Sequence, residues 1–113
     1  MISCYELFES RTASLRWNVI SVSRRKHGAS FSAYLVKAEP GQGPPLHTHP
    51  YVEVAFTLEG TATVTVGHDS REVNPGSIVV IPANTPHHFV NSGAGLLRQI
   101  GIHASPKFIQ TNL

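Results

Sequence analysis

Histidine and glutamate residues with the spacing of metal ligands lie in the middle of this sequence. His47 and His49 are separated by one residue, Glu53 follows four positions later, and His87 comes further along the chain. Successive side chains of an extended strand point to opposite faces, so the two neighbouring histidines share a face, as does the glutamate if the chain stays extended. Imidazole and carboxylate suit divalent iron, manganese, nickel, zinc or copper. The four residues are therefore predicted to bind one divalent transition metal.

Prolines and apolar neighbours around these residues support the interpretation. Pro50 follows His49 directly and biases its backbone toward an extended conformation. Pro44 and Pro45 stiffen the loop that precedes the histidines, so the backbone that carries the ligands is organised before metal binds. Glu53 lies among apolar residues, where an unpaired buried carboxylate is costly unless a cation compensates it.

Other histidines and two tyrosines are weaker candidates for the site. His88 directly follows a predicted ligand and should face the other side of its strand, and His68 falls in a turn, so neither is interpreted as a ligand. The role of His103 depends on which face of its strand lines the cavity, and a structural histidine with satisfied hydrogen bonds is the favoured interpretation. Tyr34 and Tyr51 are candidates for lining the pocket, although a role in the core is favoured for each.

Composition narrows the classes of function. The chain has 113 residues, 41% of them hydrophobic and 14% charged, as expected for one compact globular domain. A net charge of +2, with basic residues scattered outside 24–26, does not indicate nucleic acid binding. The single cysteine, Cys4, allows no internal disulfide. Residues 1–11 lack the apolar centre of a signal peptide, and no apolar run approaches the roughly 18 residues of a membrane span. We expect a cytoplasmic protein.

Short segments rich in β-branched and aromatic residues, separated by glycine and proline, make up most of the chain. The predicted strands are 15–23, 30–38, a strand that bears His47 and His49, 52–58, 61–66, 77–81, 87–90 and 96–103. The predicted connections are a hairpin turn at 24–29 that exposes His27, a loop at 39–45 and turns at 67–70 and 82–86. Residues 104–113 are expected to form an edge strand or a tail. We expect an N-terminal arm at 1–13, with a helical turn near 5–9, and one all-β domain at 14–113, an antiparallel sandwich or barrel.

Two motifs make the sequence resemble the cupins over roughly the central half of the chain. The first cupin motif is matched without a gap at Gly41, His47, His49, Glu53 and Gly60. The second is matched at Gly76, Pro82, His87 and Asn91, while Asn84 stands where the family usually has glycine. Asparagine tolerates a positive φ better than almost any other residue, so we expect the turn at 82–86 to keep its shape and to direct His87 inward.

The resemblance implies a fold, a ligand set and an oligomeric state. It implies an antiparallel jelly-roll barrel, also called a double-stranded β-helix, in which His47, His49, Glu53 and His87 bind one divalent metal. It also implies a homodimer.

The scarcity of carboxylates limits the chemistry that such a site could carry out. Once Glu53 is assigned to the metal, the remaining acidic residues fall in the N-terminal arm or at loops and turns, so none is an obvious acid or base for the cavity. Decarboxylation or epimerisation driven by a carboxylate is therefore less supported than chemistry at the metal itself. Two hypotheses stay open: a dioxygenase-type enzyme that acts on a small oxygen-donor substrate, and a binding module without turnover.

Overall fold

The computed structural model describes residues 9–11, 17–22 and 29–113, and within them the chain is folded entirely as strands and connections. The strands in chain order are β1 (Glu9–Arg11), β2 (Trp17–Val22), β3 (Ser32–Ala38), β4 (His47–Thr48), β5 (Glu53–Glu59), β6 (Ala62–Val66), β7 (Asp69–Val73), β8 (Ile78–Ile81), β9 (His87–Asn91), β10 (Leu97–His103) and β11 (Thr111–Asn112). No helix in the described ranges is long and apolar enough to cross a membrane.

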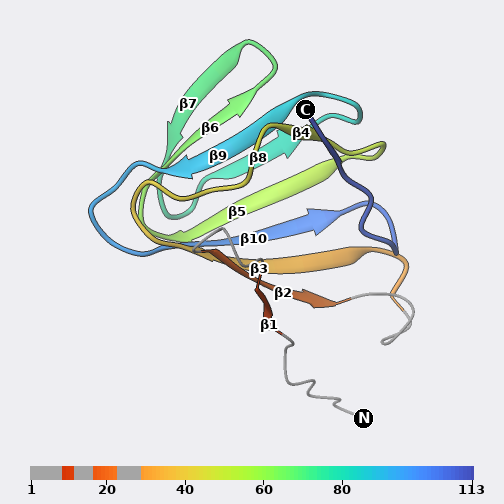
Figure 1. Ribbon diagram of the computed structural model, residues 1–113, viewed down its shortest axis with the longest axis horizontal. Helices are drawn as coiled ribbons and strands as arrows, with labels where there is room; N and C mark the ends of the chain where they lie inside the picture. The colour runs from red at the N-terminus through yellow and green to blue at the C-terminus, as the bar shows by residue number, and fades with distance from the viewer. Residues whose placement is uncertain (1–8, 12–16, 23–28) are drawn as a thin grey trace.

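Two antiparallel sheets face each other and form the barrel (Figure 1). One sheet has six strands in the order β1-β2-β3-β10-β5-β8, and the other has five in the order β11-β4-β9-β6-β7. Neighbouring strands in both sheets are often distant in sequence, as in a jelly roll built from two sheets. The prediction of an all-β antiparallel jelly-roll barrel is confirmed.

Alternation of side chains along β3 and β10 decides which residues face the interior. Both strands alternate between buried and partly exposed residues from end to end. Gln99 of β10 lies opposite Val36 of β3 and Thr57 of β5, so these buried residues share the inner face. His103 has the same parity as Gln99 and therefore also points inward. The apolar core between the two sheets consists of Ala38, Ala62, Val64, Val73 and Leu97.

The predicted strands agree with the observed ones to within a few residues at their ends, but two strands were not predicted. The prediction of a turn at 67–70 missed β7, whose exposed polar residues lack an apolar alternation, and only the beginning of this segment is a turn. Strand β1 lies inside the expected N-terminal arm and pairs with β2. The predicted hairpin turn at 24–29, with His27, and most of the predicted helical turn near 5–9 lie outside the described residues. Residues 104–113 end as an edge strand, since among the described strands β11 pairs with β4 alone.

The turn before β9 confirms the expectation for Asn84. Asn84 has a φ of 58° and is the one described residue other than glycine with a positive φ. Its backbone N–H donates a hydrogen bond to the carbonyl of His49 at 2.7 Å. The turn thus joins the connection that carries His49 to the start of the strand that carries His87.

Candidate metal centre

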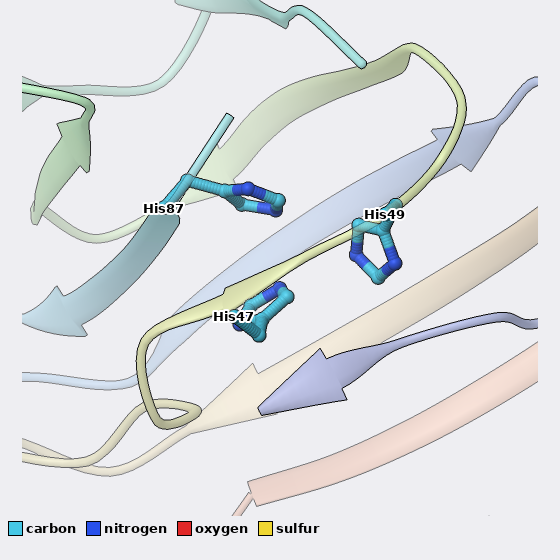
Figure 2. Close-up of side chains that lie close together, drawn as sticks. All are labelled: His47, His49 and His87. Atoms are coloured by element: carbon cyan, nitrogen blue, oxygen red, sulfur yellow. The ribbon is translucent and has the colours of Figure 1, made fainter. Parts of the chain in front are cut away.

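Three of the predicted ligands come together at one end of the five-stranded sheet. His47 on β4 lies directly opposite His87 on β9, and His49 follows two residues after His47. One ring nitrogen from each of the three histidines lies within 4.8 Å of the other two, and all three side chains are buried. Figure 2 shows the three rings gathered in one place. The structure therefore brings together residues that are forty positions apart in the sequence.

Glu53 reaches the site by a route that the sequence did not predict. The chain does not stay extended after His49, because it bends at Pro50 and Tyr51 and leaves the five-stranded sheet for the six-stranded one. Glu53 is the first residue of β5, so it approaches the histidines from the opposite sheet. Its Oε1 lies 3.3 Å from Nε2 of His49 and 3.8 Å from Nε2 of His87. The condition under which Glu53 would share the face of the two histidines is therefore not met, although Glu53 does lie at the site.

His103 is the additional member of the site. It lies opposite Glu53 in the register of β10 and β5, and its Nε2 is 2.8 Å from Glu53 Oε1. Its Nδ1 is 2.7 Å from the hydroxyl oxygen of Tyr51. Both ring nitrogens thus have partners, as the interpretation of a satisfied histidine expected, but one partner is a predicted metal ligand. His49, Glu53 and His103 form a second group of closely spaced ligand atoms.

Hydrogen bonds to backbone carbonyls set the tautomers of the three clustered histidines. A carbonyl can only accept, so each Nδ1 must carry the proton. The acceptors are the carbonyls of Pro45 for His47 at 2.6 Å, of Ile109 for His49 at 2.6 Å and of Thr85 for His87 at 2.8 Å. The lone pair of each Nε2 is thereby left for the interior of the site. Such hydrogen bonds orient the histidines of metal sites.

The Nε2 atoms of His49 and His87 provide the test of whether these residues fit a metal. Both atoms are buried and have no hydrogen-bond partner. They face the Glu53 carboxylate, which also only accepts, so acceptors oppose one another unless a cation or a proton lies between them. Three imidazole nitrogens and one carboxylate are a donor set for a divalent first-row transition metal. The residues therefore fit such an ion, which would act there as a Lewis acid.

The pKa values of the ligands reflect burial and the short distances between them. Burial acts to raise the pKa of Glu53, but the hydrogen bond from His103 and the proximity of His49 and His87 outweigh it, so the pKa lies well below its usual range and the carboxylate is ionised. Burial lowers the pKa of His47 to about 4, which keeps this imidazole neutral and able to bind metal. Burial also acts to lower the pKa of His87, yet the nearby Glu53 carboxylate and the hydrogen bond to the Thr85 carbonyl raise it overall.

Aromatic rings form the wall of the site on the side of His103. The ring of Tyr51 stacks on His49 with centroids 5.2 Å apart, and Tyr34 contacts His103 at 4.6 Å. Both tyrosines are buried, so they line the site and also belong to the buried interior. Burial raises the pKa of Tyr51 to about 12, so its hydroxyl keeps its proton. Phe108 stacks on His103 with centroids 5.7 Å apart. No local pattern in the sequence pointed to Phe108.

His88 and His68, which were not expected to bind metal, lie away from the cluster. His88 lies opposite Thr65 on β6 and belongs to neither group of ligand atoms, and His68 is exposed in the turn before β7. Within residues 29–113, the other acidic residues, Glu39, Glu59, Asp69 and Glu72, are all exposed. Among residues 29–113, Glu53 is therefore the one carboxylate of the site.

The fold and the site together define a small β-barrel protein with a cluster of histidine and glutamate side chains that fits a metal ion. The family model of the cupin domain matches residues 34–101, a range that includes four members of the cluster and ends just before His103. The chain belongs to the cupin domain family.

Two relatives match this chain over only part of their length. The chain is 39% identical over 59 residues to dimethylsulfoniopropionate lyase DddQ of Ruegeria pomeroyi, a match that covers 51% of this chain and 29% of the lyase. It is 42% identical over 41 residues to an uncharacterized protein of Streptomyces coelicolor, covering 36% of this chain and 39% of that protein. The chain thus spans well under half of these relatives.

Solved structures with the same fold include enzymes that act on oxalate. The oxalate decarboxylase of Lactobacillus farciminis, in complex with formate, superposes with a TM-score of 0.85 at 23% identity, covering 95% of this chain and 33% of the decarboxylase. An oxalate oxidase in complex with glycolate superposes with a TM-score of 0.80 at 20% identity, covering 90% of this chain and 57% of the oxidase. At these identities the likeness establishes the fold.

Proposed function

We propose that this protein binds one divalent transition metal through His47, His49, Glu53 and His87 and uses it to hold a small oxygen-donor molecule such as a carboxylate. The observation that carries the proposal is the pair of buried Nε2 atoms, on His49 and His87, that face an ionised carboxylate without a hydrogen-bond partner. A metal ion satisfies both nitrogens and the carboxylate at once. Iron, manganese, nickel, zinc and copper are all compatible with this donor set.

The charge of the site favours an anionic oxygen donor. Three neutral imidazoles and one carboxylate leave a divalent ion with a net positive charge, which attracts a carboxylate into a buried, apolar setting. The aromatic wall of Tyr34, Tyr51 and Phe108 excludes water from one side of such a ligand. The complexes of structurally similar cupins with formate and glycolate support small carboxylates as the first molecules to try.

We further propose an enzyme of the dioxygenase type, in which substrate and dioxygen meet at the metal. The absence of a second carboxylate from the described part of the site supports chemistry at the metal over carboxylate catalysis.

A second candidate is a lyase, which the match to DddQ supports. His103 and Tyr51 also support it, because these two hydrogen-bonded groups lie beside Glu53 and can transfer a proton. A binding module without turnover is the third.

Metal content tests the first step of the proposal. The protein is purified without added ions, and its metal is measured by plasma mass spectrometry for the unaltered chain and for His47→Ala, His87→Ala and the matched control His88→Ala. We expect near-stoichiometric metal in the unaltered chain and in His88→Ala, and little in the other two. Stoichiometric metal in both His47→Ala and His87→Ala would overturn the ligand assignment.

Oxygen uptake separates the candidate activities. The iron-loaded protein is incubated with catechols, diketones, thiols, oxalate and dimethylsulfoniopropionate while oxygen consumption and product formation are followed. Consumption of oxygen with product supports the dioxygenase, and product without oxygen consumption supports the lyase. If the metal-loaded protein binds formate or glycolate but converts none of these compounds, the binding module is supported instead.

We also propose that two copies of this chain associate through the outer face of the six-stranded sheet. Leu58, Ile78 and Val80 of β5 and β8 are 44%, 61% and 61% exposed, and none of the three carries charge. A second copy of the same apolar patch would cover these residues around a twofold axis. Light scattering after size exclusion should give a dimer for the unaltered chain and a folded monomer for Ile78→Glu with Val80→Glu. A monomeric unaltered chain would refute the homodimer.

A further inference from the structure

Residues 104–113, the segment that follows β10, return along the barrel to the strand that carries the first ligand. The segment begins with a hydrogen bond from the Ala104 N–H to the Val52 carbonyl at 3.0 Å. It ends with β11, which pairs with β4 so that Asn112 lies opposite His47. In Figure 1 the dark blue end of the chain runs from the tip of β10 to the neighbourhood of β4. The segment thus joins the two sheets beside the metal centre.

Ile109 connects this segment directly to two groups of the site. Its carbonyl accepts a hydrogen bond from Nδ1 of His49 at 2.6 Å. Its N–H donates to the hydroxyl of Tyr51 at 3.2 Å, and that hydroxyl lies 2.7 Å from Nδ1 of His103. His103 in turn donates from Nε2 to Glu53 Oε1 at 2.8 Å. One residue therefore orients His49 directly and Glu53 through two intervening side chains.

The origin of these hydrogen bonds distinguishes His49 from the other two clustered histidines. His47 and His87 donate to carbonyls only two residues earlier in the chain, those of Pro45 and Thr85, so their own loops orient them. The acceptor for His49 lies sixty residues later. The orientation of His49 thus depends on whether the 104–113 segment is docked.

Phe108 adds an apolar contact next to this anchor. Its ring stacks on His103 and lies edge-on to His49, with centroids 5.8 Å apart. It also meets Tyr34 edge-on at 5.4 Å. Phe108 is 53% exposed, so it stands between the buried rings and solvent. Its removal would expose two residues of the site to water.

We propose that docking of the 104–113 segment and binding of metal at the His47, His49, Glu53 and His87 site stabilise each other. The docked segment holds His49 with Nε2 toward the ion. An ion that withdraws electron density from the His49 ring strengthens the hydrogen bond from its Nδ1 to the Ile109 carbonyl. The coupling is reciprocal, so the factor by which docking raises metal affinity equals the factor by which metal favours docking. This inference rests on the proposed metal site.

Cobalt titration and hydrogen exchange test the coupling. Metal-free protein is titrated with Co(II), followed by its visible spectrum, for the unaltered chain, a variant that ends at Ala104, Phe108→Ala, Ile109→Pro and the exposed control Lys107→Ala. Losing an outer partner of a metal ligand typically lowers affinity about 10- to 100-fold. We expect that loss for the shortened chain, which lacks the Ile109 carbonyl. We expect a smaller loss for Ile109→Pro, which keeps the carbonyl but lacks the N–H that donates to Tyr51, and for Phe108→Ala, with an altered Co(II) spectrum in each. Lys107→Ala should match the unaltered chain.

Hydrogen exchange provides the reciprocal measurement and remains informative if the shortened chain does not fold. The amides of residues 105–113, apart from Pro106, should exchange more slowly when Co(II) saturates the unaltered chain, and this protection should be reduced in Phe108→Ala. Equal Co(II) affinities for the folded variants and the unaltered chain, or exchange that is unchanged by Co(II), would overturn the coupling while leaving the metal site intact. Failure of the unaltered chain to bind Co(II) would overturn the metal site and the coupling together.

Discussion

Replacement of Asn91 by alanine should separate the structural part of the second cupin motif from its metal-binding part. Asn91 is 1% exposed, and its Nδ2 donates to the carbonyls of Ala38 at 2.9 Å and Gly95 at 2.8 Å. Its Oδ1 accepts from the N–H of Gly93 at 3.0 Å. One side chain thus satisfies three backbone groups at the far end of β9, away from both groups of ligand atoms.

The size of the effect follows from these three hydrogen bonds. The alanine variant leaves the Ala38 carbonyl and the Gly93 N–H without this partner in partly or fully buried surroundings, at about 1 kcal/mol each. Gly95 is exposed, so water can replace most of the hydrogen bond that its carbonyl accepts from Asn91. Together with lost packing, we expect the free energy of unfolding to fall by about 2.5 kcal/mol, which for a chain of this size lowers the Tm by roughly 10 °C.

Urea unfolding of the metal-free protein measures this loss, and Co(II) titration of the folded variant measures the site. The control is Asn74→Ala, since Asn74 is exposed and accepts one hydrogen bond from Thr61. We expect the Co(II) affinity of Asn91→Ala to stay within about twofold of the unaltered chain, because it removes no ligand and no partner of a ligand. A stability loss no larger than that of Asn74→Ala, or a tenfold loss of affinity, would refute this reasoning.

Four further predictions follow from backbone geometry and burial. Asn84→Ala should lower the free energy of unfolding by about 1 kcal/mol in urea titration, because alanine adopts a positive φ at that cost, whereas Asn84→Gly should change it by less than about 0.5 kcal/mol. Gly43→Ala should destabilise the fold by more than about 2 kcal/mol, because its Cβ would collide with a backbone carbonyl of β9, and an unchanged Tm would contradict this. Tyr51→Phe should lower the stability of the metal-free protein by about 1 to 2 kcal/mol, because Nδ1 of His103 loses its buried partner; calorimetry that shows no loss would count against that hydrogen bond. His47 has a pKa of about 4 in the folded protein, whereas an unfolded histidine titrates near 6.5, so the unfolded state binds more protons between these values and the contribution of His47 to stability falls as the pH drops from about 6.5 to 4. The pH dependence of urea unfolding should therefore be weaker for His47→Gln over this range, and identical pH profiles would contradict the assignment.

Much of the fold and the identity of the main ligand candidates could be predicted from the sequence, because both depend on local patterns. Glycine and proline mark the connections, and short apolar segments between them predict strands whatever their partners. The spacing of His47 and His49 carries its own geometric meaning, since alternate residues of an extended segment share a face. The tolerance of asparagine for positive φ predicted the turn at Asn84, which the structure confirms. Strand β7 was not predicted because its exposed residues show no alternation of apolar and polar side chains.

Only the tertiary structure decided how the site is assembled. Glu53 enters from the opposite sheet because the chain bends at Pro50, and local propensity does not report which sheet a strand joins. His103 belongs to the site because the register of β10 on β5 places it opposite Glu53, and register is set by pairing between strands that are distant in sequence. The Ile109 carbonyl acts on His49 from sixty residues away through a backbone group that every residue possesses, so no side-chain pattern marks it. The sequence determined which residues can bind a metal, and the tertiary structure determined which groups hold them in position.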